Sequence, residues 1–418
     1  MVAWLNGGFA FQLDSLVHFT TPASLAEETN RVLRILGAVL LLLCSSVCAD
    51  AKPRVVPPPQ RSDPLAKLAQ QIEPDLVGRA DRLTQYIELY RVNLANDTRL
   101  FAFDVSAEAN QAGQVELSGH IEFEETRVGL VGLLNVLGFE VLDEKLKTLP
   151  DESLGSKAYG FVKTTHALSY SRPSEPRSVV TDCLLGEPLY LLREEGGHLL
   201  VHSGEGYLGY VSADDVHRVD AVAFARYPTE SSVRMVENHT LDSGLVIPAG
   251  SQLKRLPSKG ESITVALPTG ETAEIAREKC EDANSSAAAI ERAIVAAKQL
   301  LGTPYHWGGK TSEGIDCSGL VQVAFATTGV HLPRDSNQQF LLGQLTGTRW
   351  HRAGLRRGDT LYFLGSYGRI RHTALYLGDD RFLHAQTPVV TIGSFNPDHD
   401  EYDPRRAANF AFGKRLWQ

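Results

Sequence analysis

Short runs of alternating apolar and polar residues, separated by glycine- and proline-containing turns, fill the chain between Tyr159 and Arg218. Strands this brief at regular spacing do not build a large open sheet and are typical of a small barrel. A fainter copy of the pattern runs from Val222 to Arg277. We predict two consecutive small barrels, over 158–219 and 221–280. One larger β sandwich over the same residues is the alternative.

Length and charge limit the other choices. At about 150 residues per domain, 418 residues predict three or four domains. Hydrophobic residues make up 43% and charged residues 22%, which excludes a disordered or collagen-like chain. The net charge of −9, with no long basic run, argues against a nucleic-acid partner.

The first 51 residues are typical of an export signal. Arg31 and Arg34 precede the apolar stretch 35–47, and Ala49-Asp50-Ala51 offers a small-x-small cleavage site. The apolar stretch is shorter than the roughly 20 residues that a membrane-spanning helix needs, so we expect no stable membrane span. The true start is expected nearer Val32. A buried helix is the alternative, but the proline-rich linker 52–63 follows at once.

A small α+β module is predicted over 64–152. Residues 64–94 have helical spacing, 100–105 and 114–121 alternate as strands do, and 126–139 return to helix before a last strand. We assign no activity to this module. After residue 284 an alanine-rich helix opens the last predicted domain, 285–418, with an apolar stripe that includes Ile290, Ile294 and Leu301.

Cys317 follows a glycine-containing loop and begins the segment CSGLVQVAFATTG, whose apolar residues have helical spacing. The first turn of a helix stabilises a thiolate through the helix dipole and unpaired backbone N–H groups. Cys317 is therefore a candidate nucleophile. A small buried hydrophobe is an equally good interpretation of this cysteine taken alone.

Two histidines favour the nucleophile. The segments RHTALYL and RFLHA flank Gly378-Asp379-Asp380 and predict a β hairpin with a three-residue turn. If Leu377 pairs with Arg381, His372 and His384 are diagonal neighbours on one face, within reach of a hydrogen bond. A thiolate needs a nearby base, and that base needs a partner that fixes its tautomer.

A metal site is the competing explanation of Cys317, His372 and His384. These residues show no close ligand pair such as C-x-x-C or H-x-x-x-H, so we predict no metal and no cofactor. His198 and His202 have the second spacing, but on a strand they lie too far apart to share a metal.

Four motifs in this order carry a family resemblance: GTPYHWGG…GIDCSGLVQ, LPRDSNQQ, LRRGDTLYF and RHTALYLGDDRFLHA. Together they resemble the NlpC-type, papain-like cysteine peptidases of bacterial cell walls, over about 285–418. Two SH3-like barrels ahead of the catalytic domain are the arrangement found in the γ-D-glutamyl-L-diamino acid endopeptidase branch, which this chain therefore resembles. The resemblance implies an α+β fold: a papain-like catalytic domain preceded by two SH3-like β barrels and an N-terminal α+β module.

Carried over residue by residue, the resemblance implies Cys317 as nucleophile, His372 as general base and His384 as the residue that orients His372. It also implies residues that line the substrate cleft or hold the free amine of an N-terminal L-Ala: Asp316, Ser318, Trp307, Ser336, Glu175 and Tyr207. Tyr305 matches the tyrosine that helps to stabilise the oxyanion. An aspartate beside the nucleophile raises the thiol pKa, so a bound ammonium would compensate it. Asp316 as a simple helix N-cap is an equally good interpretation.

The implied protein is an exported enzyme, periplasmic or extracellular and associated with the cell wall. It would hydrolyse the γ-D-glutamyl to diamino acid bond of peptidoglycan stem peptides or muropeptide fragments through an acyl-enzyme. An amidase or acyl-transfer enzyme on the same scaffold, and a non-catalytic wall-binding protein, are the alternatives. The sequence leaves open whether Cys183 and Cys280 are bridged.

Overall fold

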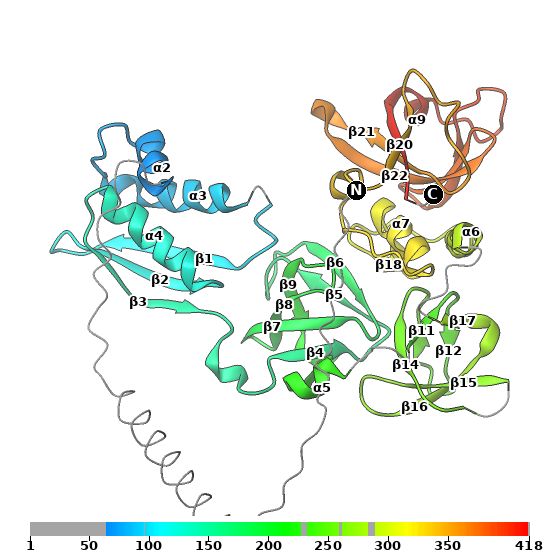
Figure 1. Ribbon diagram of the computed structural model, residues 1–418, viewed down its shortest axis with the longest axis horizontal. Coiled ribbons are helices and arrows are strands. Elements are labelled where there is room, and N and C mark those ends of the chain that lie inside the picture. The colour runs from blue at the N-terminus through cyan, green and yellow to red at the C-terminus, as the bar shows by residue number, and fades with distance from the viewer. Residues whose placement is uncertain (1–63, 96, 227–231, 259–260, 283–288, 417–418) are drawn as a thin grey trace, which may run out of the picture. The chain divides into compact units, whose positions relative to one another are not determined.

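The computed structural model describes residues 64–95, 97–226, 232–258, 261–282 and 289–416. The predicted export segment 1–51 and the linker 52–63 lie outside the described residues and stay predictions. The described part is a mixed α/β structure with many strands and few helices (Figure 1). None of the helices in these ranges is long and apolar enough to cross a bilayer.

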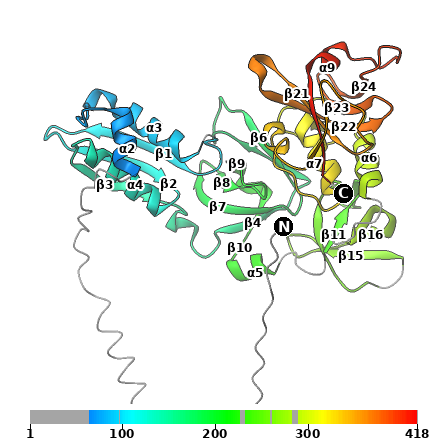
Figure 2. The same cartoon turned by 45° about the horizontal axis from the view of Figure 1, so that its top comes forward.

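The first group of elements contains three helices and a three-stranded sheet. Its elements are α2 (Pro64–Ile72), α3 (Leu83–Leu94), β1 (Phe103–Ala109), β2 (Val115–Ile121), α4 (Glu124–Val136) and β3 (Val141–Thr148). β2 pairs antiparallel with β1 and parallel with β3, and α3 and α4 pack against this sheet (Figures 1 and 2). Leu83, Tyr86, Ile87 and Tyr90 are buried because this spacing places them on one face of α3. The helices and strands predicted in this stretch are present.

The next strands form a seven-stranded sheet. They are β4 (Tyr159–Val162), β5 (His166–Tyr170), β6 (Val179–Leu184), β7 (Pro188–Glu195), β8 (His198–His202), β9 (Leu208–Ser212) and β10 (Val216–Val219). Their order is β10-β4-β7-β8-β9-β5-β6. Gly196 and Gly197, both at positive φ, make the tight turn between β7 and β8. Leu189, Leu199 and Val211 are buried in the hydrophobic core of this sheet.

A separate five-stranded sheet follows, with the order β16-β15-β14-β11-β17. Its strands are β11 (Ser232–Met235), β14 (Gln252–Arg255), β15 (Ser262–Ala266), β16 (Thr272–Ala276) and β17 (Cys280–Asp282). The short strands β12 (His239–Thr240) and β13 (Val246–Ile247) pair with each other. Cys280 is buried in the core of this sheet, whereas Cys183 is buried in the core of the seven-stranded sheet, and the two form no disulfide with each other.

The C-terminal group combines helices with a six-stranded antiparallel sheet of order β20-β25-β21-β22-β23-β24. Its strands are β20 (Gln344–Thr348), β21 (Thr360–Leu364), β22 (Ile370–Gly378), β23 (Arg381–Ala385), β24 (Val390–Ser394) and β25 (Phe410–Arg415), and the short β18 (Lys310–Thr311) and β19 (Gly314–Ile315) form a pair of their own. Its helices are α6 (Ala289–Gln299), α7 (Cys317–Ala326), α8 (Ser336–Gln339) and α9 (Pro404–Asn409).

The core of this group lies between α6, α7 and one face of the sheet. Ile294, Leu320 and Phe325 of the helices share a buried cluster with Leu375 and Leu383 of β22 and β23. One detail of the predicted helix is wrong. α6 ends at Gln299, so Leu301 leaves the apolar stripe and is 43% exposed.

The predicted hairpin forms between β22 and β23, with a different turn. Leu375 pairs with Leu383, which is the predicted register. The predicted pairing of Leu377 with Arg381 is wrong, because a register shift at Leu377 makes Gly378 the partner of Arg381. Asp379 and Asp380 both have positive φ, as in a two-residue type I′ turn.

Candidate active site

Cys317 is the first residue of α7, where the sequence placed it. Asp316 is the N-cap of this helix, and its carboxylate accepts a hydrogen bond of 2.7 Å from the backbone N–H of Gly319. The Cys317 side chain is buried, and its sulfur accepts from the backbone N–H of Thr373 in β22. That contact brings the sulfur to the residue that follows His372.

His372 and His384 interact across the hairpin as predicted. His372 Nε2 lies 2.9 Å from Nδ1 of His384, and both rings are buried. Nε2 of His384 has no hydrogen-bond partner. The two imidazoles are therefore joined across β22 and β23, and the Cys317 sulfur contacts β22 at the residue after His372.

Burial is the largest influence on the pKa values of Cys317, His372 and His384. Burial and the adjacent Asp316 raise the pKa of the Cys317 thiol to about 11. Burial, followed by the charge of Arg406, lowers the pKa of His384 to about 3 and that of His372 well below its usual value. Burial thus opposes the helix dipole and favours a neutral thiol beside neutral imidazoles, and the thiolate expected from the sequence stays a prediction.

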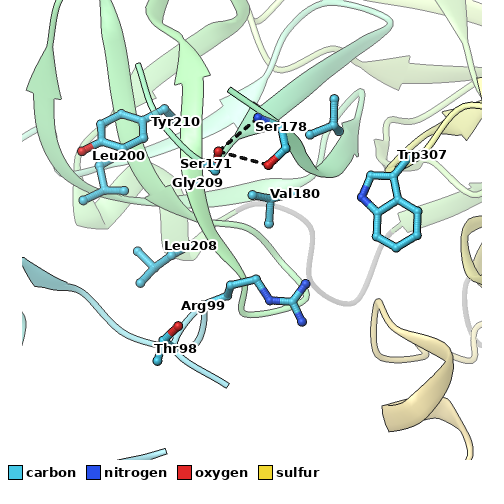
Figure 3. A pocket seen from close by; sticks show the side chains of 11 residues that line it. Thr98, Arg99, Ser171, Ser178, Val180, Leu200, Leu208, Gly209, Tyr210 and Trp307 are labelled. Atoms are coloured by element: carbon cyan, nitrogen blue, oxygen red, sulfur yellow. Dashed lines mark hydrogen bonds between the residues drawn. The ribbon is translucent and has the colours of Figure 1, made fainter. Parts of the chain in front are cut away.

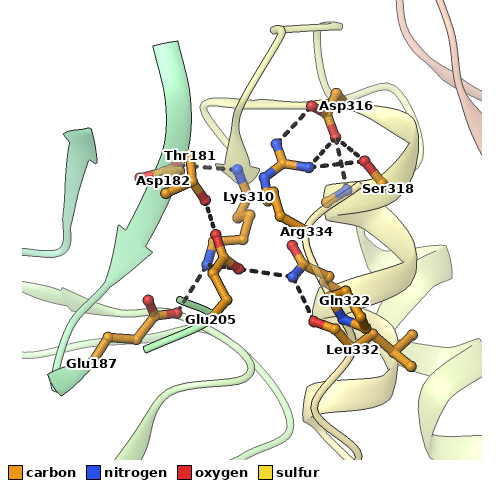
Figure 4. A network of polar contacts seen from close by, with 12 residues as sticks. Thr181, Asp182, Glu187, Glu205, Lys310, Asp316, Ser318, Gln322, Leu332 and Arg334 are labelled. Carbon is orange, nitrogen blue, oxygen red and sulfur yellow. Dashed lines mark hydrogen bonds and ion pairs between the residues drawn. The ribbon is translucent and has the colours of Figure 1, made fainter. Parts of the chain in front are cut away.

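Arg334 is the residue that sequence reasoning missed. Its Nη1 and Nη2 donate to the two Asp316 carboxylate oxygens at 3.0 and 2.6 Å, and Nη1 also reaches Ser318 Oγ at 2.9 Å (Figure 4). Arg334 therefore supplies the compensation for Asp316 that we had assigned to a bound ammonium. It stands in the motif LPRDSNQQ, which was the only available signal.

The other residues nominated within this group lie close to the same helix start. Ser318 shares Arg334 with Asp316. Ser336 is buried at the first position of α8. Tyr305 is half-buried, and burial, Cys317 and Asp316 raise the pKa of its phenol, which shows that it lies close to these groups. The structure shows Asp316 as the cap of α7, and its binding of a substrate amine stays a prediction.

Trp307 lines a pocket of about 360 Å³. The indole is 55% exposed and shares the pocket with Arg99 and with Ser178 of the seven-stranded sheet group (Figure 3). The pocket adjoins the site, because the N–H of Gly308 donates to Asp316 Oδ2 at 2.8 Å. Contact of Trp307 with a substrate stays a prediction.

Of the two residues nominated from the seven-stranded sheet group, Tyr207 is linked to the α8 region and Glu175 is not. Tyr207 is buried, and its hydroxyl accepts from Arg99 Nη2 at 3.1 Å. Arg99 also pairs with Asp335, the residue before Ser336, at 2.7 Å, so Tyr207 is linked to the α8 region. Glu175 is exposed, and its carboxylate pairs with Arg177 rather than with a residue of the Cys317 site.

A buried ionic network lies behind the site. Lys310 Nζ contacts Glu187 at 3.0 Å and Glu205 at 3.5 Å. Glu205 also accepts from Gln322 of α7 at 2.8 Å (Figure 4). Among the described residues, no three His, Cys, Asp or Glu side chains are grouped to hold a metal ion.

A cysteine at a helix start, beside two hydrogen-bonded histidines on a sheet, has the components of a thiol hydrolase. Residues 302–403 match the family model of the NlpC/P60 family. The chain therefore carries an NlpC/P60 domain, the domain of a cysteine peptidase family, near its C-terminal end.

Several known proteins are similar to the chain. It is 29% identical over 261 residues to dipeptidyl-peptidase 6 of Lysinibacillus sphaericus, covering 56% of this chain and 90% of that protein. It is 25% identical over 225 residues to the gamma-D-glutamyl-L-lysine dipeptidyl-peptidase of Bacillus cereus, covering 49% and 66%. The crystal structure of an NlpC/P60 family protein from Bacillus cereus shares the fold, with a TM-score of 0.53 and 21% identity over 62% of this chain and all of that chain. Other curated relatives match over smaller shares of their own length, from 25% to 58%.

Proposed function

We propose that the protein is an exported cysteine peptidase that hydrolyses the γ-D-glutamyl to diamino acid bond of peptidoglycan stem peptides. The proposal rests on the hydrogen bond between His372 and His384. His372 lies in β22 next to Thr373, whose backbone N–H contacts the Cys317 sulfur. The name of the Bacillus cereus relative, a gamma-D-glutamyl-L-lysine dipeptidyl-peptidase, supports the choice of bond. The proposal includes a papain-like domain over 285–418, preceded by SH3-like barrels over 158–219 and 221–280.

His372 acts as the base in this proposal. If Nε2 of His372 carries the proton shared with His384, Nδ1 of His372 is free to accept the Cys317 proton. The thiol and the imidazole are both neutral at rest, so we expect proton transfer to accompany attack rather than to precede it. The sulfur bonds to the carbonyl carbon, and the diamino acid leaves as an amine that takes the proton from His372. Water, deprotonated by His372, then releases the acyl group and regenerates the thiol.

The start of α7 stabilises the developing oxyanion. Backbone N–H groups at a helix start, including that of Cys317, point toward the reacting carbonyl and need no rearrangement during the reaction. Tyr305, close to Cys317, is proposed to add a hydroxyl donor. Its raised pKa keeps that hydroxyl protonated at neutral pH.

The proposal keeps the preference for peptides with a free N-terminal L-Ala. Asp316, Ser318 and Tyr207 are the residues proposed for that end of the substrate. Because Arg334 already neutralises Asp316, we expect the preference to be modest. A peptide with an acetylated N-terminus measures it directly.

The test digests L-Ala-γ-D-Glu-diaminopimelate peptides with the full chain and identifies the products by mass. We expect release of L-Ala-D-Glu by the native chain and by a Cys183→Ala control, which removes a buried cysteine of the seven-stranded sheet. Cys317→Ala is expected to lose the activity. Release of a sugar-free peptide from a muropeptide would instead identify an amidase, and wall binding without turnover would identify a binding protein.

A further inference from the structure

Arg406 is a buried arginine beside the candidate active site. It is the third residue of α9, lies beyond the region that matches the NlpC/P60 family, and is 8% exposed. Its guanidinium carbon lies 5.7 Å from the centre of the Phe363 ring. That ring centre is 5.5 Å from the centre of the His372 ring. The Arg406 cation therefore lies close to the proposed base.

The guanidinium of Arg406 has few partners. Nη2 donates to Gln386 Oε1 at 3.3 Å, and the buried Nε has no hydrogen-bond partner. Asp403 binds the backbone N–H of Arg406 as the cap of α9, not the guanidinium. Among the residues that the structure describes, Arg406 forms no ion pair with a carboxylate. A buried cation without a counter-charge is costly, which favours an anion that arrives with a ligand.

The proposed substrate carries such an anion. D-Glu linked through its γ-carboxyl group keeps a free α-carboxylate, separated by a short carbon chain from the carbonyl that Cys317 would attack. Arginine binds a carboxylate with two parallel hydrogen bonds, and Nε is one of the donors that such a pair can use. The carboxylate would thus satisfy both the unpaired charge and the unpartnered nitrogen.

We propose that Arg406 binds the α-carboxylate of the γ-linked D-Glu residue and so selects carboxylate over carboxamide stem peptides. This inference rests on the proposed function, because it assumes that the γ-glutamyl group occupies the site. Arg406 is then a specificity-determining residue.

A different explanation is that Arg406 acts only on the reacting sulfur. Its charge lowers the pKa of Cys317, so losing it would slow every substrate by a similar factor. Recognition of the α-carboxylate instead predicts an effect that depends on the substrate. The ratio of two substrates that differ only at this group separates the explanations.

The kinetic experiment compares L-Ala-γ-D-Glu-diaminopimelate with its α-carboxamide analogue. For the native chain we expect kcat/KM to favour the carboxylate by about 10- to 100-fold, as for hydrogen bonds to charged groups. Arg406→Gln is expected to reduce this ratio to about 2 or less, and Arg406→Lys to give an intermediate ratio. Arg405→Gln, which removes the charge of an exposed neighbour on the same helix, is expected to keep the native ratio. An unchanged ratio in Arg406→Gln overturns the inference.

A binding experiment separates failure of the inference from failure of the proposed function. Calorimetry on Cys317→Ala measures binding of L-Ala-γ-D-Glu and of its α-carboxamide, with and without Arg406→Gln. Tighter carboxylate binding that depends on Arg406 supports the inference even if the native chain cleaves a different bond. Equal binding of both ligands by the Arg406-containing protein overturns it even if the peptide is cleaved. Thermal unfolding confirms folding of the variants, since removal of an unpaired buried charge is not expected to destabilise the chain.

Discussion

Asp316 shows how one residue combines several functions in this site. Its carboxylate caps α7, accepts from the N–H of Gly308 and pairs with Arg334. The Asp316 charge raises the pKa of the Cys317 thiol, whereas the Arg334 cation beside it lowers that pKa. The reactivity of Cys317 therefore depends on Arg334 as well as on the histidines.

Loss of Arg334 should slow chemical modification of Cys317. Arg334 lowers the pKa of the thiol, so Arg334→Met is expected to raise that pKa and to slow alkylation by iodoacetamide severalfold at pH 8. Arg334→Lys keeps the charge and should restore most of the rate. Arg127→Met, at a partly exposed ion pair with Glu124, is the control. Equal rates in Arg334→Met and the native chain would contradict this role.

Burial of the two histidines should make stability depend on pH. The pKa of His384 is about 3 in the folded chain, below the unfolded value of about 6.5, and that of His372 is also lowered. The folded chain thus prefers the neutral rings. The stabilisation is fully present above pH 6.5 and is lost as pH falls from 6.5 toward 3.

Replacing His384 tests this dependence. His384→Gln removes one of the two groups, so the free energy of unfolding should fall less steeply between pH 6.5 and pH 4 than in the native chain. Urea unfolding at several pH values measures both slopes. His351→Gln, at an exposed histidine, serves as the control and should keep the native slope. A variant slope as steep as the native one would show that His384 is protonated in the folded chain.

At the scale of elements, the loop before β18 is fitted closely to the seven-stranded sheet group. Gly308 has φ +84, and a Cβ there would lie 2.3 Å from Val179 Cγ1. Gly302, which follows α6 at the start of the same loop, has φ +81, but a Cβ there meets no heavy atom within 4 Å. The two glycines thus share a backbone conformation and differ in their surroundings.

This pair separates backbone strain from packing. Gly302→Ala should lower the free energy of unfolding by about 1–2 kcal/mol, the cost of a left-handed backbone. Gly308→Ala should cost roughly 1–3 kcal/mol more, because the methyl group overlaps Val179. The double variant Gly308→Ala with Val179→Ala should recover part of that excess. Equal losses for the two single variants in urea unfolding would mean that the loop moves away from the sheet.

The hairpin shows what local pattern can predict. Period two and a turn between two apolar runs were sufficient to place His372 and His384 as diagonal neighbours on one face of the hairpin. The exact turn was not predictable, because a bulge at Leu377 and the positive φ of Asp379 and Asp380 exchange a three-residue turn for a two-residue one. The register at the histidines matches the prediction because the bulge lies between Leu375 and the turn and does not change the pairing beyond it.

The residues that the sequence did not reveal are buried charges. Arg334 pairs with a residue 18 positions away, and Lys310 with one 123 positions away. No local pattern encodes such pairs, since each depends on how distant segments pack. The same packing buries Cys317. Burial raises the pKa of its thiol, whereas its place at a helix start predicts a lowered pKa.

At the scale of the whole molecule, Lys310 joins the NlpC/P60 domain to the seven-stranded sheet. It is 5% exposed and contacts Glu187 and Glu205, which follow β6 and β8 of that sheet. Burial alone would lower the pKa of Lys310, but the two glutamates raise it, so the amine stays charged. Glu205 in turn accepts from Gln322 of α7, the helix that begins at Cys317. The position of α7 therefore depends on the buried Lys310 cation, which the NlpC/P60 domain places between two glutamates of the seven-stranded sheet group.

Lys310→Met should show how strongly this network holds. Removing one partner of a buried ionic group typically costs about 3–5 kcal/mol, because it leaves an uncompensated charge. Adding Glu205→Gln removes one of the two orphaned carboxylates and should recover at least half of the loss. Lys145→Met, at an exposed ion pair with Glu116, is the control and should leave the stability close to that of the native chain. Urea unfolding measures all four proteins. If the double variant is as unstable as Lys310→Met, the uncompensated charge of Glu205 is not the cause of the loss.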